Sequence, residues 1–182
     1  MVQAPRTTPP QAVLFDRDGT LVVDVAYNGD PERVAAMPTA RATVRALRAA
    51  QVPIGVISNQ SGIGRGILTA EEVERVNERI DVTLGPFDVW EVCPHTPEDG
   101  CRCRKPEPGM VFDAARRLGV AASRLAVIGD IAADVEAAHA AGAIGVLVPT
   151  ERTRRSEVRE APLVASDLAG AVTLLFERTA FP

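Results

Sequence analysis

The sequence predicts an α/β fold built on a doubly wound parallel sheet, and two patterns lead to this prediction. Five short apolar runs recur along the chain: AVLF (12–15), PIGVI (53–57), DVWEV (88–92), LAVIG (125–129) and GVLV (145–148). Each run is too short and too uniformly apolar for an amphipathic helix, and each is typical of a buried parallel strand. Helical patterns lie between the runs, and such alternation of strand and helix is typical of a doubly wound sheet.

The predicted helices are marked by apolar residues at helical spacing and by residues that favour helix ends. Thr69 and Glu72 form the capping-box pattern that opens one helix. Pro108 and Gly119 bracket another. The sequence therefore predicts helices over residues 40–50, 71–84, 109–118, 133–141 and 168–178.

Length and composition indicate a single domain. The chain has 182 residues, 46% of them hydrophobic, which suits one globular domain with a sizeable core. Residues 1–11 are rich in Pro, Thr and Gln, so we expect a flexible N-terminal tail there. We expect residues 12–182 to form the domain.

Charge and hydropathy exclude several classes of partner. The formal net charge of -4 gives no electrostatic reason to expect a nucleic acid or an anionic membrane as partner, whereas a small phosphorylated molecule remains possible. The mixed-charge run ERTRRSEVRE (151–160) is expected to be a solvated loop or helix face. No apolar run reaches the roughly 18 residues of a membrane span, and MVQAPRTTPPQ lacks the apolar core of a secretion signal. We therefore expect a cytoplasmic protein, with a monomer as the default state.

Polar residues follow four of the predicted strands. In an open parallel sheet, ligands bind outside the carboxyl ends of the strands. Each polar group alone also suits a turn or a helix cap. Together, however, several carboxylates beside one lysine would repel one another unless a divalent cation neutralised them, and oxygen ligands suit Mg²⁺, which in turn binds a phosphoryl group. The residues are Asp16, Asp18, Ser58, Asn59, Gln60, Arg104, Lys105, Asp130 and Asp134.

A second cluster combines thiols and one imidazole. All three cysteines and one of the two histidines lie within the eleven residues CPHTPEDGCRC (93–103). Cys93, His95, Cys101 and Cys103 form a full tetrahedral ligand set for structural Zn²⁺, with no open position for chemistry. The alternative, thiols that only fill core space, fits poorly among Pro, Glu, Asp and Arg. The odd number of cysteines argues against a disulfide framework. The metal would staple the loop that carries Arg104 and Lys105 into the site.

Four stretches resemble, in order, the motifs of the haloacid dehalogenase superfamily of phosphatases: FDRDGTL (15–21), VISNQSGIGRG (56–66), CRKPEPGM (103–110) and VIGDIAADVEAAHAAG (127–142). The DRDGT form, together with SNQSG, CPH and CxCRKP, is similar more narrowly to the group of D,D-heptose 1,7-bisphosphate and histidinol-phosphate phosphatases. The resemblance spans residues 12–150. It implies a Rossmann-like core with a minimal cap and a zinc-stapled loop.

The resemblance also implies a nucleophile, an acid and a metal. Asp16 would attack phosphorus and carry an aspartyl-phosphate, and Asp18 would protonate the leaving alcohol and later activate water. Mg²⁺ would be held by Asp16, the main-chain carbonyl of Asp18, and Asp130. Asp134 would support this shell or orient Lys105.

Further residues would bind the substrate. Ser58 and the amide of Asn59 would donate to the phosphoryl oxygens, and Lys105 would balance the charge of phosphate and nucleophile. Arg104 would contact the substrate, because a guanidinium suits a second phosphate or a pair of hydroxyls. The roles of Arg17 and Arg65 stay open.

The expected activity is Mg²⁺-dependent hydrolysis of a small sugar phosphate, with the 7-phosphate of heptose 1,7-bisphosphate as first candidate. Histidinol phosphate is an alternative substrate, and a catalytically silent, zinc-stapled binding domain is an alternative of another class. The intact set of Asp16, Asp18, Ser58, Lys105 and Asp130 argues against silence. The zinc loop is shorter than is usual in the group, Ile131 replaces a polar residue of many relatives, and residues 22–38 are expected to form a flap, so substrate identity depends on these segments.

Overall fold

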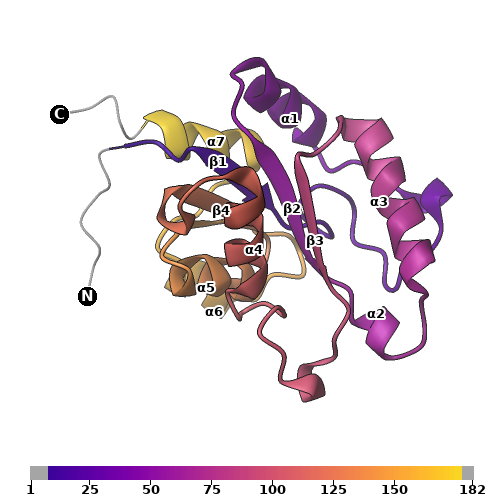
Figure 1. Cartoon of the computed structure of the whole chain (residues 1–182). Coiled ribbons are helices and arrows are strands. Elements are labelled where there is room, and N and C mark those ends of the chain that lie inside the picture. Colours follow the sequence, from indigo (N-terminus) through magenta and orange to yellow (C-terminus); the bar gives the residue numbers. More distant parts are fainter. Residues whose placement is uncertain (1–7, 178–182) are drawn as a thin grey trace.

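The computed structural model describes residues 8–177, and within them the chain forms one five-stranded sheet in the order β3-β2-β1-β4-β5 (Figure 1). The strands are β1 (Ala12–Phe15), β2 (Ile54–Asn59), β3 (Val89–Cys93), β4 (Leu125–Gly129) and β5 (Ile144–Leu147). Every neighbouring pair is parallel, so the predicted parallel sheet is confirmed. Strand β2 ends two residues later than predicted, because Ser58 and Asn59 continue the ladder opposite Val92 and Cys93.

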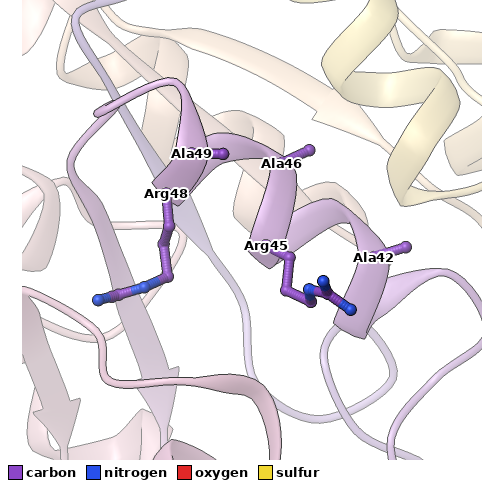
Figure 2. Close-up of a pocket in the computed structure, with 5 residues that line it drawn as sticks. All are labelled: Ala42, Arg45, Ala46, Arg48 and Ala49. Atoms are coloured by element: carbon purple, nitrogen blue, oxygen red, sulfur yellow. The ribbon is translucent and has the colours of Figure 1, made fainter.

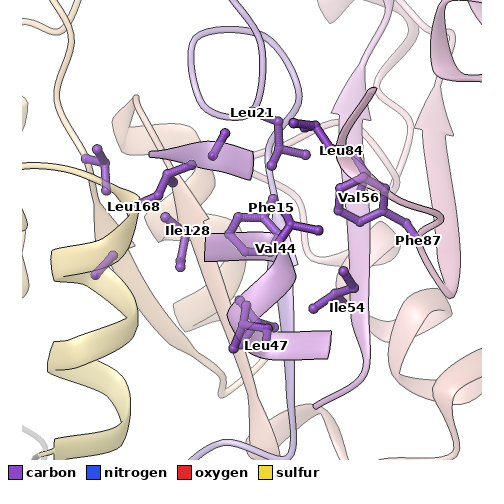
Figure 3. Close-up of a cluster of buried hydrophobic side chains, with 14 of the residues drawn as sticks. Phe15, Leu21, Val44, Leu47, Ile54, Val56, Leu84, Phe87, Ile128 and Leu168 are labelled. Carbon is purple, nitrogen blue, oxygen red and sulfur yellow. The ribbon is translucent and has the colours of Figure 1, made fainter. Parts of the chain in front are cut away.

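Helices cover both faces of the sheet. One face carries α1 (Ala40–Ala49), α3 (Ala70–Leu84) and α7 (Leu168–Glu177), and the other carries α4 (Gly109–Leu118) and α5 (Ala132–Ala140). Side chains alternate along β1: Val13 and Phe15 join the first cluster, whereas Ala12 and Leu14 join the second. Figure 3 shows Phe15 of β1 and Ile128 of β4 packed against Val44 and Leu47 of α1 in the first cluster. The doubly wound arrangement follows from burying both faces.

The capping box predicted before α3 is confirmed. Thr69 Oγ1 accepts a hydrogen bond from Glu72 N (3.1 Å), and Glu72 Oε2 accepts one from Thr69 N (2.8 Å). Two reciprocal bonds satisfy two of the unpaired donors at the helix start. The buried residues of α3 are Val73, Val76, Ile80 and Leu84, which form one stripe along the helix.

The run 151–160, expected to be a solvated loop or helix face, contains the short helix α6 (Arg155–Glu160). Several other short elements were not predicted: α2 (Ser61–Gly64) and the 3₁₀ turns η1 (Pro31–Arg33), η2 (Pro97–Asp99) and η3 (Ala122–Arg124). Each is too short to show a helical period in the sequence. Residues 22–38, predicted as a flap, form a loop whose two ends lie together, because Val22 bridges Ala36 and Met37 N donates to Leu21 O (2.9 Å). Tyr27 of this segment lies against Gly62 of α2.

The predicted N-terminal tail is described only from residue 8 onward. Residues 1–7, and the predicted helix end at 178, lie outside the described residues. Gln11 N donates to Arg124 O (2.7 Å), and Arg124 Nη2 donates to Pro9 O (3.1 Å), so residues 9–11 are anchored beside β4. Within residues 8–177, no helix has both the length and the apolar character that a membrane span requires.

Candidate active site

The sheet order brings the ends of β1 and β4 together at the point where the winding reverses. From β1 the chain builds outward through β2 and β3, and it then returns to place β4 on the other side of β1. Loops that leave adjacent strands toward opposite faces open a crevice at such a point. Asp16 follows β1 and Asp130 follows β4, so both aspartates lie at this crevice.

Three buried carboxylates and one ammonium meet there. Asp16, Asp130 and Asp134 each place a carboxylate oxygen within 4.8 Å of the others. Lys105 Nζ lies 2.6 Å from Asp16 Oδ1 and 2.6 Å from Asp134 Oδ1, and it donates to Ile57 O (2.9 Å). One positive charge against three carboxylates leaves the cluster with an excess of negative charge.

Proton affinities in the cluster reflect this excess. Burial raises the pKa of Asp16 well above its ordinary value, Lys105 opposes that shift, and Asp134 adds to it. Burial, reinforced by Asp134, raises the pKa of Asp130 to about 7. Burial alone would lower the pKa of Lys105, but the charges of Asp134 and Asp16 outweigh it and raise that pKa above its usual range. A compact set of oxygen donors with surplus negative charge fits a hard divalent cation such as Mg²⁺.

Two glycines allow the loops to close on these carboxylates. Gly19 has φ +83°, and a Cβ there would lie 2.5 Å from Asp130 Oδ2. At Gly129, a Cβ would lie 2.2 Å from the carboxyl carbon of Asp134. Any side chain at either position would displace a carboxylate of the cluster.

The Asp18 carboxylate is held by two donors. Its Oδ2 accepts from Arg17 Nε (3.0 Å) and from Gln60 Nε2 (2.9 Å), and Gln60 Nε2 also lies 2.8 Å from Ser58 Oγ. Gln60 therefore connects Ser58 to Asp18. The sequence marked Gln60 only as a polar residue after a strand, and no local signal indicates that it reaches back to Asp18.

Asn59 and Arg104 make contacts that differ from their predicted roles in substrate binding. The Asn59 side chain pairs with the backbone of Lys105: its Oδ1 accepts from Lys105 N and its Nδ2 donates to Lys105 O, both at 3.1 Å. Arg104 Nη1 donates to His95 O (3.2 Å), which ties it to the cysteine loop. The predicted amide contact of Asn59 and the substrate contact of Arg104 stay predictions.

The predicted zinc ligands gather in one place. Cys93, His95, Cys101 and Cys103 bring their ligand atoms within 4.8 Å of one another, and the three thiols are free of disulfides. The sulfurs of Cys93 and Cys103 lie 3.2 Å apart, and His95 Nδ1 lies 3.2 Å from Cys103 Sγ. Burial and the neighbouring Cys103 thiol raise the pKa of Cys93 to about 12. Three sulfurs and one imidazole nitrogen that converge at this spacing fit a tetrahedral Zn²⁺ site. The raised thiol pKa does not oppose such a site, because a bound metal stabilises thiolates.

The mixed-charge segment after β5 supports the Asp130 loop, a role that the sequence did not reveal. Thr153 Oγ1 donates to Asp130 O (2.6 Å), and Glu157 Oε1 of α6 accepts from Ala132 N (3.0 Å). Arg152 pairs with Asp24 of the 22–38 segment. The segment keeps exposed arginines, as expected for a solvated face, but Thr153 and Glu157 face the loop that would hold a metal.

A separate surface pocket lies on α1, lined by Ala42, Arg45, Ala46, Arg48 and Ala49 (Figure 2). Its lining has no carboxylate, hydroxyl or thiol, so it lacks the groups that phosphoryl transfer needs. The crevice between β1 and β4 is therefore the candidate active site.

Comparisons with known proteins identify the family of the chain. The HAD-hydrolase-like family matches residues 102–171. The D-glycero-β-D-manno-heptose-1,7-bisphosphate 7-phosphatase of Bordetella bronchiseptica is 32% identical over 174 residues, which cover 91% of this chain and 97% of that protein. The enzyme of the same name from Rhodopseudomonas palustris is 37% identical over 145 residues, or 74% of this chain and 81% of that protein.

Solved structures place the fold in the same group. The crystal structure of D,D-heptose 1,7-bisphosphate phosphatase from B. bronchiseptica, complexed with magnesium and phosphate, superposes with a TM-score of 0.82 at 30% identity. The match covers 92% of this chain and 98% of that one. The chain therefore belongs to the haloacid dehalogenase-like hydrolases, in the group of the heptose 1,7-bisphosphate 7-phosphatases.

Proposed function

We propose that this phosphatase removes the 7-phosphate of D-glycero-D-manno-heptose 1,7-bisphosphate. The observation that carries the proposal is the cluster of Asp16, Asp130, Asp134 and Lys105, in a chain whose relatives of that name match it over most of its length. A phosphatase site needs a nucleophile, a proton donor and positive charge for the phosphoryl group. The residues at the crevice can supply each of these.

Asp16 is the proposed nucleophile. Its carboxylate would form a bond to phosphorus as the bond from phosphorus to the sugar oxygen breaks, which leaves an aspartyl-phosphate. Lys105 lies 2.6 Å from Asp16 Oδ1, so it would keep that oxygen fixed and leave Oδ2 to attack. Ser58, at the end of β2, would donate to the transferring phosphoryl group.

Asp18 is the proposed acid and base. It would give its proton to the sugar oxygen as that oxygen leaves, so that the product is a neutral alcohol. As a carboxylate it would then take a proton from the water that attacks the aspartyl-phosphate. This second step releases inorganic phosphate, restores the Asp16 carboxylate and reprotonates Asp18.

Asp16, Asp130 and the main-chain carbonyl of Asp18 would hold Mg²⁺. When bound, the ion supplies positive charge that lets an anionic nucleophile approach an anionic phosphate. Asp134 would serve the site indirectly, because its carboxylate pairs with Lys105 and accepts from Ile131 N (3.2 Å).

The zinc loop would complete the substrate side of the site. Zn²⁺ bound to Cys93, His95, Cys101 and Cys103 would stiffen the residues just before Arg104 and Lys105. Arg104 is proposed to bind the second phosphate of the bisphosphate, which requires its guanidinium to leave or share its contact with His95 O.

The test is phosphate release from a panel of substrates. The panel contains both anomers of heptose 1,7-bisphosphate, heptose 7-phosphate, other phosphosugars and histidinol phosphate, each with and without Mg²⁺. We expect the highest kcat/KM with a heptose 1,7-bisphosphate and activity that depends on Mg²⁺. Preference for histidinol phosphate would replace the proposed substrate but keep the reaction class.

The nucleophile is tested separately by Asp16→Asn. The amide keeps the shape of the carboxylate but cannot form the acyl phosphate, so we expect activity to fall by at least about 10³-fold. Phosphate release at the wild-type rate would show that Asp16 does not attack. Circular dichroism of the variant checks that the fold is retained.

A further inference from the structure

A buried arginine lies between the two aspartates of the site, and the chemistry proposed above gives it no role. Arg17 is 1% exposed. Its Nε donates to Asp18 Oδ2 (3.0 Å), and its Nη1 donates to Asn77 Oδ1 of α3 (2.9 Å). A guanidinium removed from water is tolerated only where its N–H groups find partners, and its planar fork then fixes the direction of those partners.

We propose that Arg17 is a positioning residue that fixes the Asp18 carboxylate for proton transfer, and that Asn77 holds Arg17 in the required orientation. The inference rests on the proposed phosphatase function and deepens it. It assigns one set of contacts, Asn77 to Arg17 to Asp18, to the proton-transfer step and not to metal or phosphate binding.

The pattern of hydrogen bonds on Asp18 supports this role. Among the described residues, both hydrogen bonds to its carboxylate, from Arg17 Nε and from Gln60 Nε2, are accepted by the same oxygen, Oδ2. With Oδ2 occupied by two donors, Oδ1 is the oxygen that carries the proton to the leaving group. The Asp18 side chain is 25% exposed and that of Arg17 is 1% exposed, so the guanidinium holds the carboxylate from the buried side.

The contact with Asn77 extends this control to α3. Asn77 is 60 residues away in sequence and lies on a helix that is anchored to the core through Val73, Val76 and Ile80. A rigid helix is a better support for a catalytic side chain than the loop that follows β1. The position of Asp18 therefore depends on a residue that is half-buried and outside the crevice.

A purely structural role for Arg17 predicts a different outcome in one measurable respect. A sugar alkoxide is a poor leaving group and needs a proton from Asp18, whereas p-nitrophenolate leaves without one. The constant kcat/KM covers only the steps through the first ester cleavage, so water attack on the aspartyl-phosphate does not enter it. Misplacing Asp18 lowers kcat/KM for the sugar phosphate alone, while general damage to the site lowers it for both esters.

The experiment compares kcat/KM for p-nitrophenyl phosphate and for the sugar phosphate that the wild type hydrolyses best. We expect Arg17→Met to lose about 10²-fold with the sugar phosphate and less than about threefold with p-nitrophenyl phosphate. Asn77→Leu should lose about tenfold with the sugar phosphate only, while Asn77→Asp, which keeps the acceptor, should behave like the wild type. Glu78→Leu, at the next and exposed position of α3, is the matched control and should leave both constants unchanged.

Two results would overturn the inference: equal losses with both esters, or no loss with either, in Arg17→Met and Asn77→Leu. Asn77→Leu carries the test alone if Arg17→Met does not fold, as judged by circular dichroism. The proposed function is tested by other arms of the same assay. A wild type that hydrolyses neither ester contradicts the proposed function itself. An Asp18→Asn variant without the leaving-group selectivity contradicts the role of Asp18 as the acid, and with it the inference for Arg17, but leaves the phosphatase reaction in place.

Discussion

At the scale of single residues, the central feature is an ammonium group shared by Asp16 and Asp134. Lys105 is the only lysine in the sequence. It comes from a loop 89 residues after Asp16, and its Nζ reaches two carboxylates and one backbone carbonyl. Because the ammonium has three protons, these three acceptors can use all of them.

This arrangement predicts a lysine that stays charged at unusually alkaline pH. Burial lowers the pKa of Lys105, but the charges of Asp134 and Asp16 outweigh burial and raise it. A raised lysine pKa contributes stability that is fully present below the unfolded value of about 10.4 and is lost only as pH rises through the folded value. The measurement is ¹⁵N NMR of protein labelled at lysine Nζ. One signal is expected, and its chemical shift should not change as pH passes through about 10.4.

The matched variant for this measurement is Asp134→Asn. It removes one of the two ion-pair partners while keeping an oxygen for Ile131 N, so the pKa of Lys105 should move down toward its ordinary value. A wild-type signal that titrates at or below about 10.4 would contradict the ion-pair account.

At the scale of elements, the segment that follows β5 and includes α6 supports the loop of Asp130. Its contacts to that loop come from Thr153 and Glu157. Groups that support metal ligands typically change metal affinity by about 10–100-fold when they are removed. Thr153→Val deletes the hydroxyl that donates to Asp130 O, so we expect Mg²⁺ affinity to weaken by about tenfold. The readouts are the Mg²⁺ concentration for half-maximal activity and the Mg²⁺ dependence of the melting temperature.

Glu160→Gln serves as the control for this prediction, because Glu160 is an exposed residue at the end of α6, in the same segment after β5. Its Mg²⁺ dependence should match that of the wild type. An unchanged Mg²⁺ affinity in Thr153→Val would show that the Asp130 loop holds its geometry without the hydroxyl of Thr153.

The junction between α3 and β3 is organised by one carboxylate. Asp81 Oδ1 accepts from Phe87 N and from the indole Nε1 of Trp90, both at 3.2 Å. Trp90 and Phe87 pack edge to face, with centroids 5.6 Å apart. The carboxylate therefore links the end of α3 to the aromatic cluster beside β3.

Asp81→Ala is expected to lower the free energy of unfolding by about 1–3 kcal/mol, because it leaves two partly buried donors without their acceptor. Asp81→Asn keeps the acceptor and removes the charge. Burial raises the pKa of Asp81, so the folded state binds the proton more tightly than the unfolded state, and the ionised form destabilises the fold above the folded pKa. Asp81→Asn should therefore be more stable than the wild type at neutral pH, with the difference disappearing as pH falls below about 4.

Urea unfolding followed by the fluorescence of Trp90, the only tryptophan, measures both variants. Equal stability of Asp81→Ala and wild type at neutral pH would mean that the two hydrogen bonds contribute nothing. A difference between Asp81→Asn and wild type that persists at pH 3 would contradict the pH argument.

At the scale of the whole molecule, sequence patterns predicted the parallel sheet and both residue clusters because they depend on local signals. The five apolar runs marked the strands, and residues that follow strands must gather at one edge of a parallel sheet. Contacts between distant side chains left no such signal. Asn77 contacts Arg17 at a sequence separation of 60 residues, and Gln60 contacts Asp18 at a separation of 42. No periodicity or motif in the sequence predicts either contact. The helix α2 was missed, and the run that contains α6 was left open between loop and helix, because four and six residues are too few to show a period.

The zinc loop leads directly into Arg104 and Lys105 of the candidate site. Removal of the zinc should therefore lower the activity while the fold is retained. Cys93 ends β3 and pairs with Asn59 of β2, whereas His95, Cys101 and Cys103 lie beyond the strand. The Asn59 side chain holds the backbone of Lys105 independently of the metal. Purified protein should contain about one zinc per chain. Cys101→Ser should lose the zinc and most phosphatase activity but keep its far-ultraviolet circular dichroism, because the loop before Arg104 is released while the sheet stays intact.

Ser123→Ala, a hydroxyl deletion in η3 far along the chain from the ligands, is the control and should retain zinc. Wild-type activity in a protein that contains no zinc would show that the contacts of Asn59 with Lys105 are enough to shape the site. Global unfolding of Cys101→Ser would instead show that the core depends on the metal. The expected result lies between these two, because two hydrogen bonds can hold the backbone of Lys105 but cannot order the loop from Pro94 to Arg104.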